Sequence, residues 1–358
     1  MSAQSKSHLH RTAFAALLVL ATACATGEPN LSRPPSAQHQ LLLELPCRGG
    51  VALAPDGTRV ATSNGWALEV RAVPGGTKLA RHELRLGADA VSGACVAWSP
   101  DGRWLAASAR GERSVVVVEA QTEGAPARRV DLAHGRATVL AFAHASGELT
   151  VGTDQGFLER FDAATGAGRG SIALAPNSAQ GPLPVAFAAW TGRDELLLAS
   201  AGKGGLAAFE PQDGARAWER LDERPLALDA TGTRLVTASM DRAEARGIDL
   251  ADPRSPRVLA TVRDPAGDGR PELAAWCGTE GRLAIAFTRS FVLARWLDAE
   301  FFTLERTAEG SAALAHAGGV RIGAPAMIAG DGTGRWLAVG ASDGASVYDL
   351  DGWFRASR

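Results

Sequence analysis

The sequence predicts an all-β protein, folded as a seven-bladed β-propeller of four-stranded blades over residues 40–352. Three observations carry this prediction. A turn glycine recurs about every 46 residues, a short apolar run lies on each side of it, and a third strand follows. Four strands per repeat are typical of propeller blades, and seven such units can close a ring without exposed sheet edges.

The composition of the 358 residues is that of a globular protein, with 46% hydrophobic and 21% charged residues. Lys and Arg number 37 against 39 Asp and Glu, which gives a net charge of −2. No basic field is present to attract a polyanion, so we exclude nucleic acid as a partner.

The first 24 residues predict attachment to a membrane. A basic start precedes an uncharged apolar run over 12–23, which has the features of a signal peptide and is too short to span a bilayer. The run Leu20–Cys24 resembles the lipobox of bacterial lipoproteins. That resemblance implies that residues 1–23 are removed and that Cys24 carries the lipid. The alternative is an ordinary secretory signal with an incidental cysteine.

Residues 24–39 lack apolar periodicity and contain three prolines, which predicts an extended, flexible tether. By the same resemblance, acyl chains on Cys24 hold the protein on a membrane without spanning it. No Asp follows Cys24, and among lipoproteins of two-membrane bacteria this implies the outer membrane, facing the periplasm. The expected location is therefore the bacterial cell envelope.

An apolar segment at 40–45 (QLLLEL) precedes the first repeat, whereas only a short tail, 353–358, follows the last blade. We predict that this N-terminal strand pairs with Val347 of the last blade. The pairing would close the ring and leave no sheet edge open.

Seven tripeptides predict the turn between the first and second strands of each blade, and the first two have the Asp-Gly chemistry of hairpins. They are Pro55-Asp56-Gly57, Pro100-Asp101-Gly102, Ala145-Ser146-Gly147, Trp190-Thr191-Gly192, Ala230-Thr231-Gly232, Thr279-Glu280-Gly281 and Gly332-Thr333-Gly334. Third strands are predicted at 114–119, 157–162, 205–210 and 345–350, and a more polar fourth strand at 78–86.

These units resemble the WD-repeat family, most clearly over 96–119 and 338–349. In blade three, His134 has the spacing of the family's buried histidine, and Asp154 lies near the position of its hydrogen-bond partner. Phe161 replaces the family's tryptophan, so that network is incomplete here. The resemblance implies the fold and says little about function.

The sequence shows no set of residues for catalysis or metal binding. Cys95 and Cys277 are predicted to be buried thiols on innermost strands, with a Cys47–Cys95 bridge as the alternative. The histidines after the signal segment are scattered singly, which predicts no metal site. Residues 340–344 (GASDG) fit a nucleophile elbow, but they lie between two predicted strands, where that motif needs a following helix. We predict no catalytic residue and no cofactor.

Function in a propeller usually resides in loops carried by the rigid ring. The longest connections from an outer strand to the next inner strand are predicted on one face, at 87–94, 175–184, 263–272 and 307–325. The third is the most charged and could bind a cation or a polar partner, with solvated charge as the alternative. Trp66 follows a turn and is predicted to be exposed, whereas the strand tryptophans pack between blades. The candidate binding residues are Arg263, Asp264, Asp268, Arg270 and Trp66.

These observations favour a non-catalytic, lipid-anchored propeller that binds other proteins of the envelope. The alternative is an enzyme or small-molecule binder that uses the central channel, where seven inner strands converge. A channel lined by carboxylates or histidines would favour that alternative, and one lined by Ala, Val and Gly would favour the scaffold. Residues 161–166 and 208–218 also resemble quinoprotein-type propeller repeats, which implies a role in outer-membrane assembly as a further alternative.

Overall fold

The structure is a computed structural model that describes residues 41–351 with internal gaps. The gaps are 46–49, 64–66, 85–94, 109–111, 121, 123–124, 175–180, 203–204, 268, 279–280, 292–293, 307–311, 324–326 and 341–343. The predicted signal segment, Cys24, the tether and the C-terminal tail therefore lie outside the described residues.

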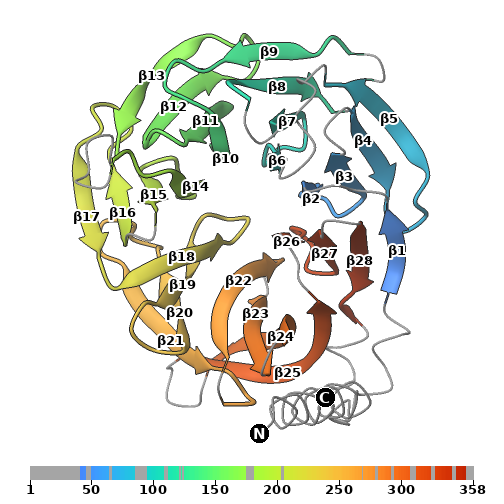
Figure 1. The fold of residues 1–358 in the computed structure, drawn as a ribbon, viewed down its shortest axis with the longest axis vertical. Helices are drawn as coiled ribbons and strands as arrows, with labels where there is room; N and C mark the ends of the chain where they lie inside the picture. Colours follow the sequence, from blue (N-terminus) through green and yellow to red (C-terminus); the bar gives the residue numbers. More distant parts are fainter. Residues whose placement is uncertain are drawn as a thin grey trace, which may run out of the picture. The chain divides into compact units, whose positions relative to one another are not determined.

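Residues 41–351 form seven four-stranded antiparallel sheets arranged as a ring (Figure 1). Every element of the described chain is a strand. In the first six blades the strands follow chain order from the centre of the ring outwards. The predicted all-β, seven-bladed propeller is thereby confirmed.

The blades are numbered in chain order, and the bounds of their strands are as follows. Blade one is β2 (Val51–Leu53), β3 (Arg59–Ser63), β4 (Ala67–Ala72) and β5 (Lys78–Glu83). Blade two is β6 (Cys95–Trp98), β7 (Trp104–Ser108), β8 (Ser114–Glu119) and β9 (Arg128–Asp131). Blade three is β10 (Ala137–Phe142), β11 (Glu148–Thr153), β12 (Phe157–Asp162) and β13 (Gly168–Ala173). Blade four is β14 (Val185–Trp190), β15 (Leu197–Ala201), β16 (Leu206–Phe209) and β17 (Arg216–Arg220).

The remaining strands complete the ring. Blade five is β18 (Glu223–Leu228), β19 (Arg234–Ser239), β20 (Glu244–Asp249) and β21 (Arg257–Arg263). Blade six is β22 (Arg270–Cys277), β23 (Arg282–Phe291), β24 (Ala294–Arg306) and β25 (Ala312–Gly323). Blade seven is β26 (Met327–Gly330), β27 (Trp336–Gly340), β28 (Ala345–Asp349) and, as its outer strand, β1 (Leu41–Leu45).

Blade seven takes its fourth strand from the beginning of the chain. β1 pairs antiparallel with β28, and Leu43 lies opposite Val347, as predicted. Leu45 and Val347 are both buried in the core of this blade. The first and last strands of the propeller therefore hold the ring together in one sheet.

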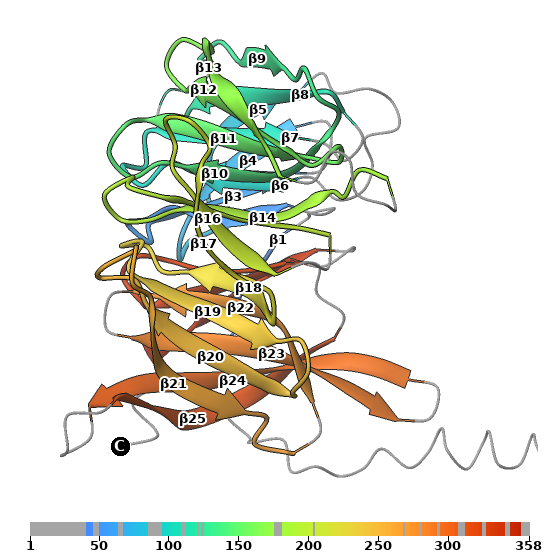
Figure 2. The ribbon, with the colours of Figure 1, turned by 90° about the vertical axis from the view of Figure 1, so that its left-hand side faces the viewer.

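Blade six departs from the predicted pattern. Its last three strands have 10, 13 and 12 residues, and the β23–β24 hairpin extends beyond the other blades (Figure 2). The long connection predicted at 307–325 is wrong over most of its length, because Ala312–Gly323 pairs with β24 as the outer strand. This pairing has register shifts at Leu297/Asp298 and Phe301/Phe302, which accommodate irregular backbone.

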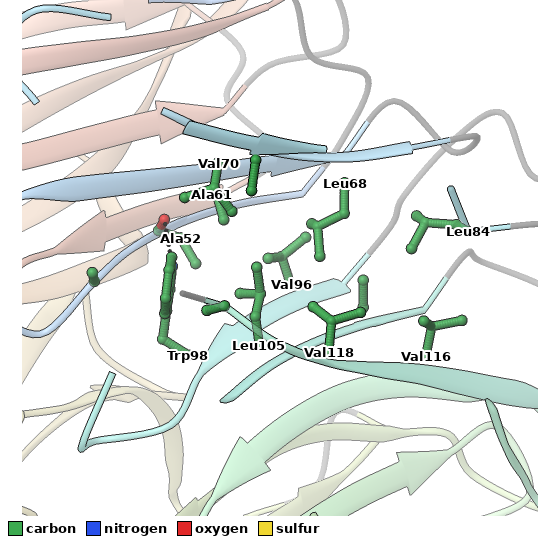
Figure 3. Close-up of a cluster of buried hydrophobic side chains, with 14 residues drawn as sticks. Ala52, Ala61, Leu68, Val70, Leu84, Val96, Trp98, Leu105, Val116 and Val118 are labelled. Atoms are coloured by element: carbon green, nitrogen blue, oxygen red, sulfur yellow. Dashed lines mark hydrogen bonds between the residues drawn. The ribbon is translucent and has the colours of Figure 1, made fainter. Parts of the chain in front are cut away.

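The hydrophobic core lies between neighbouring blades. Between blades one and two, Leu68 and Val70 of β4 pack with Val96 and Leu105 from the next blade (Figure 3). Trp98 joins this cluster and donates its indole N–H to the carbonyl oxygen of Ala52 at 3.1 Å. Burying each such aliphatic side chain contributes about 1.5–3 kcal/mol.

Other strand tryptophans also pack between blades, as predicted. Trp190 is buried in a cluster shared by blades three and four and donates to Thr150 Oγ1 at 3.0 Å. Trp276 is buried with Val236 of blade five. A tryptophan at or next to the end of the inner strand thus connects each of these blades to the preceding one.

Arginine side chains cross the same interfaces to main-chain oxygens. Arg128 Nη1 donates to the carbonyl of Ala163 at 2.8 Å, from blade two to blade three. Arg282 Nη1 donates to the carbonyl of Gly334 at 2.9 Å, from blade six to blade seven. Both carbonyls lie in turns outside the strands, so the guanidinium groups give them hydrogen-bond partners from the preceding blade.

The predicted turn glycines lie between the first and second strands, and six of the seven have positive φ, from 63° to 79°. Blade four is the exception, because Asp194 takes the left-handed conformation there, at φ 56°. Glycine is needed at 192 for a different reason, the close approach of the next blade. A Cβ there would collide with the carbonyl oxygen of Thr231 in blade five.

The left-handed turn aims the Asp194 carboxylate at the corresponding turn of blade three. It accepts hydrogen bonds from the backbone N–H groups of His144 at 2.6 Å and of Ala145 and Ser146 at 2.9 Å each. Three main-chain donors of one blade are thus satisfied by a single side chain of the next.

We predict that Asp194→Gly, which keeps the left-handed backbone but removes the carboxylate, lowers the free energy of unfolding by about 2 kcal/mol. Hydrogen bonds to a charged group each contribute roughly 1.5–3 kcal/mol, and water replaces part of that at an exposed turn. Asp194→Asn keeps an acceptor oxygen and is the matched control. Urea unfolding measures both, and equal stability of Asp194→Gly and the wild type would contradict the prediction.

Candidate functional site

The predicted binding loop joins the outer strand of blade five to the inner strand of blade six. Arg263 ends β21 and Arg270 begins β22, and both are exposed. Asp264 is buried at 5% exposure and accepts hydrogen bonds from the N–H groups of Ala266 at 3.1 Å and Gly269 at 2.6 Å. Its carboxylate therefore shapes the loop, while both arginines are charged groups that the loop presents to solvent.

Two of the predicted site residues fall in gaps of the structure. Trp66 and Asp268 lie outside the described residues. The connections predicted at 87–94 and 175–184 fall largely outside the described residues.

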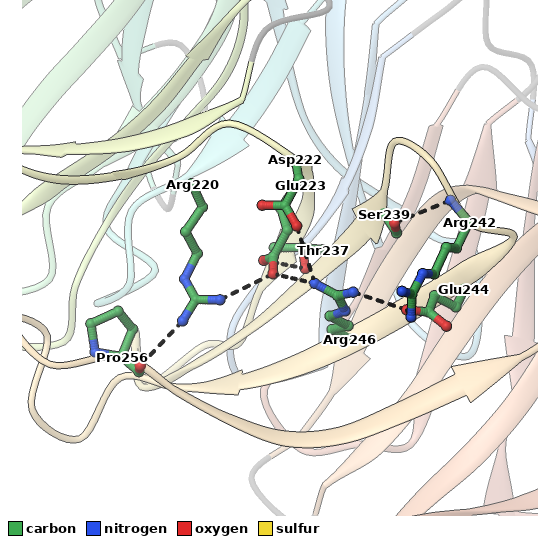
Figure 4. A network of polar contacts seen from close by, with 9 residues as sticks. All are labelled: Arg220, Asp222, Glu223, Thr237, Ser239, Arg242, Glu244, Arg246 and Pro256. Carbon is green, nitrogen blue, oxygen red and sulfur yellow. Dashed lines mark hydrogen bonds and ion pairs between the residues drawn. The ribbon is translucent and has the colours of Figure 1, made fainter.

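A buried carboxylate organises the neighbouring end of blade five (Figure 4). Glu223, the first residue of β18, is fully buried. Its Oε1 accepts from Arg220 Nη1 at 3.0 Å and from Arg246 Nη1 at 2.9 Å, and its Oε2 accepts from Thr237 Oγ1 at 2.9 Å. Both oxygens are satisfied, which is the condition for a buried charge to be tolerated.

Arg246 extends this arrangement to a second carboxylate. Its Nη2 donates to Glu244 Oε1 at 3.0 Å. Arg242 Nη1 lies 3.9 Å from Oε1 and Arg263 Nη2 lies 3.5 Å from Oε2 of the same group. Glu244 is 4% exposed, whereas the side chains of Arg242 and Arg263 are 67% and 76% exposed. We call this set the blade-five ion-pair chain: Arg220, Glu223, Arg246, Glu244, Arg242 and Arg263.

Within the blade-five ion-pair chain, the contacts of Glu244 and Arg246 favour the charged forms of these two side chains. The hydrogen bond from Arg246, together with the positive charges of Arg246, Arg242 and Arg263, lowers the pKa of Glu244 below its ordinary value. Hydrogen bonds to Glu223 and Glu244 raise the pKa of Arg246. Removing one partner from a buried pair of this kind costs roughly 3–5 kcal/mol. The blade-five ion-pair chain therefore holds its side chains in defined positions.

The inner strands carry little charge. β2, β6, β10, β14 and β26 contain no Asp, Glu, Lys, Arg or His, and their residues are mostly Ala, Val and Leu. The charged residues of the inner strands are confined to β18 and β22. There, Arg224 Nη2 lies 3.4 Å from Glu272 Oε2 and donates to the carbonyl of Pro271 at 2.9 Å.

Blade three does not build the histidine network of the WD-repeat family. The His134 side chain is 40% exposed, stacks on Phe157 with ring centroids 4.2 Å apart, and has Nδ1 3.6 Å from Glu159. Asp154 instead accepts a hydrogen bond from the backbone N–H of Arg136 at 2.9 Å. A phenylalanine in place of tryptophan at 161 is consistent with this altered arrangement.

The two described cysteines lie on innermost strands, as predicted. Cys277 is buried, and burial raises the pKa of its thiol, so it is a poor nucleophile. Cys95 is only half-buried, with Sγ 3.1 Å from the carbonyl oxygen of Thr138. Cys47 lies outside the described residues, so the alternative Cys47–Cys95 bridge remains a hypothesis.

Within the described ranges, no three His, Cys, Asp or Glu side chains gather as a metal-binding group. Strands β27 and β28 flank the 340–344 motif, as expected for a hairpin. No helix among the described residues has the length and apolar character needed to cross a bilayer.

Sequence reasoning identified Arg263 but missed Glu223, Glu244 and Arg246. Glu244 and Arg263 are paired across β20 and β21, a relation that depends on strand register. The sequence contained one indication of this cluster. Glu223 and Arg224 begin an inner strand, whereas the inner strands of most other blades carry no charged residue.

No family model matches the chain, and no curated protein matches it either. Solved structures do match, 1497 chains in all, so the likeness is broad and selects no single activity. A chain of the mitotic checkpoint complex has 13% identity and a TM-score of 0.65, covering 89% of this chain and 97% of that one.

Two further structures give the same result. The β-propeller domain of Cps50 (Swd1) from Myceliophteria thermophila has 14% identity and a TM-score of 0.65, covering 86% of this chain and 98% of that domain. U3-55K has 15% identity and a TM-score of 0.61, covering 87% and 98%. By fold, the chain is a WD-repeat-like seven-bladed propeller.

We predict that Glu244→Gln lowers the melting temperature at pH 7, because three guanidinium groups lose their shared carboxylate. The pKa of Glu244 in the folded chain lies below the ordinary 4.5, so its stabilising contribution is present above about pH 4.5 and is lost as the pH falls through the folded pKa. The difference in melting temperature between variant and wild type should therefore shrink from pH 7 to pH 3. An equal deficit at both pH values would argue against this role.

Proposed function

We propose that the protein is a non-catalytic, lipid-anchored propeller that acts as a protein-interaction scaffold in the bacterial cell envelope. The propeller fold is consistent with such a scaffold, since a rigid ring presents many turns and loops on two faces. The anchor and the location rest on the sequence pattern of residues 1–24.

One observation carries the choice of a scaffold over a channel enzyme. Five of the seven inner strands contain neither carboxylate nor histidine, and the Glu223 and Glu272 side chains of the other two are paired with arginines. General acid and base catalysis needs titratable groups held near a substrate. By contrast, the exposed arginines Arg242 and Arg263 lie at one end of blade five, where a macromolecular partner can reach them.

The anchor is tested by metabolic labelling with radioactive palmitate in a bacterium that processes lipoproteins. The wild type is expected to incorporate label and to fractionate with the outer membrane. Cys24→Ala is expected to remain unlabelled and unprocessed. Equal labelling of both proteins, or a labelled protein in the inner membrane, would contradict the proposed anchor or its location.

The scaffold role is tested by crosslinking the tagged protein in its native envelope. A stoichiometric protein partner is expected with the wild type, and its yield should fall at least 10-fold with Arg242→Glu/Arg263→Glu. Arg103→Glu, on blade two and 58% exposed, is the matched control and should leave the yield unchanged. Recovery of the propeller alone would contradict the scaffold.

A further inference from the structure

Two exposed apolar side chains lie on neighbouring turns at the same end of blade five. Leu221 is 70% exposed in the turn before β18, and Met240 is 42% exposed in the turn after β19. The N–H of Met240 donates to the carbonyl of Asp222 at 2.9 Å, which joins the two turns. Large apolar side chains on a water-facing surface are typical of contact sites when they occur together with arginine.

Two arginines lie at the same end of blade five: Arg242 is in the β19–β20 turn with Met240, and Arg263 ends β21, opposite Glu244. The guanidinium groups of Arg242 and Arg263 make no side-chain hydrogen bond within the described part of the chain, and both are attracted to Glu244 from 3.9 and 3.5 Å. The hydrogen bond to that carboxylate comes from Arg246. The donors of the two exposed arginines therefore remain available to an acceptor from outside.

The turns that carry these side chains are fixed in place. Ser239 Oγ accepts the backbone N–H of Arg242 at 3.2 Å and closes the turn that presents Met240. Asp222 Oδ2 accepts from Arg246 Nη1 at 3.5 Å, which holds the first turn against the blade-five ion-pair chain. A surface fixed before binding loses less conformational entropy when a partner docks.

We propose that this surface, the blade-five patch of Leu221, Met240, Arg242 and Arg263, binds a protein segment in which an apolar side chain stands next to a carboxylate. The apolar side chain packs on Leu221 and Met240. The carboxylate accepts hydrogen bonds from the arginines, whose planar donors match carboxylate geometry. The proposal rests on the proposed scaffold function and names the chemistry of its partner.

The charges around the patch favour a single carboxylate over a polyanion. Asp222 is 59% exposed and Asp241 is also exposed, and each would repel the successive phosphates of a nucleic acid or an anionic membrane. A single carboxylate carries less negative charge for these aspartates to repel than a run of phosphates does. The chain's net charge of −2 also disfavours binding to a polyanion.

An array of random 12-residue peptides, probed with the full chain in detergent, tests the proposal. Bound peptides are expected to be enriched in Asp or Glu next to Leu, Ile, Met or Phe. Fluorescence anisotropy with the best peptide should show at least 10-fold weaker binding to Arg242→Gln/Arg263→Gln and to Leu221→Ser/Met240→Ser. Arg242→Lys/Arg263→Lys should retain an intermediate affinity, because it keeps the charge and loses the paired donors.

Leu79→Ser/Arg103→Gln is the matched control, since these side chains are 44% and 58% exposed on other blades. It should bind as the wild type does, and melting temperatures confirm that all the variants fold. Enrichment of peptides without a carboxylate, unchanged binding by the patch variants, or preferential binding to phosphatidylglycerol vesicles would overturn the proposal.

The outcomes also separate this proposal from the scaffold function. If envelope crosslinking yields a partner that the blade-five patch variants still bind, the scaffold stands and the patch is wrong. If crosslinking yields no partner and no peptide binds, both fail.

Discussion

Contact between neighbouring blades is the constraint on which the rest of the structure depends. Each sheet buries its faces only against the next one, so no blade has a complete core by itself. Side chains that cross the interfaces reach main-chain oxygens, as Trp98 does at Ala52 and Arg282 at Gly334. These bonds fix the angle between blades as well as their distance, because an indole or guanidinium donates in a defined direction.

The same requirement explains the character of blade five. Its inner strand begins with a buried glutamate, which would be costly without partners, and the arginines that compensate it come from β17 and β20. The blade-five ion-pair chain that results ends at the exposed Arg242 and Arg263. Leu221 and Met240 are exposed at the same end of this blade. The side chains that compensate the buried glutamate thus continue to two exposed arginines at one end of blade five.

The sequence predicted the fold well because the signals were local. The third strands of two repeats, predicted at 114–119 and 157–162, have the observed bounds. The long hairpin of blade six was missed, since residues 291–294 (FVLA) contain none of the usual turn residues. The blade-five ion-pair chain was missed for another reason, because Glu223 and Arg246 are 23 residues apart and meet only through the registers of three strands.

The pairing of β1 with β28 makes the order of synthesis matter for folding. The outer strand of blade seven is made first and its three partners last, so this sheet cannot form until almost the whole propeller has been synthesised. Bringing together segments about 300 residues apart is slow, because the loop between them loses conformational entropy on closure. Blades one to six can assemble earlier, but they remain an open arc with two exposed sheet faces at its ends. The last blade therefore turns a chain of nearest-neighbour contacts into one cooperative unit, and late folding intermediates are the species most exposed to aggregation.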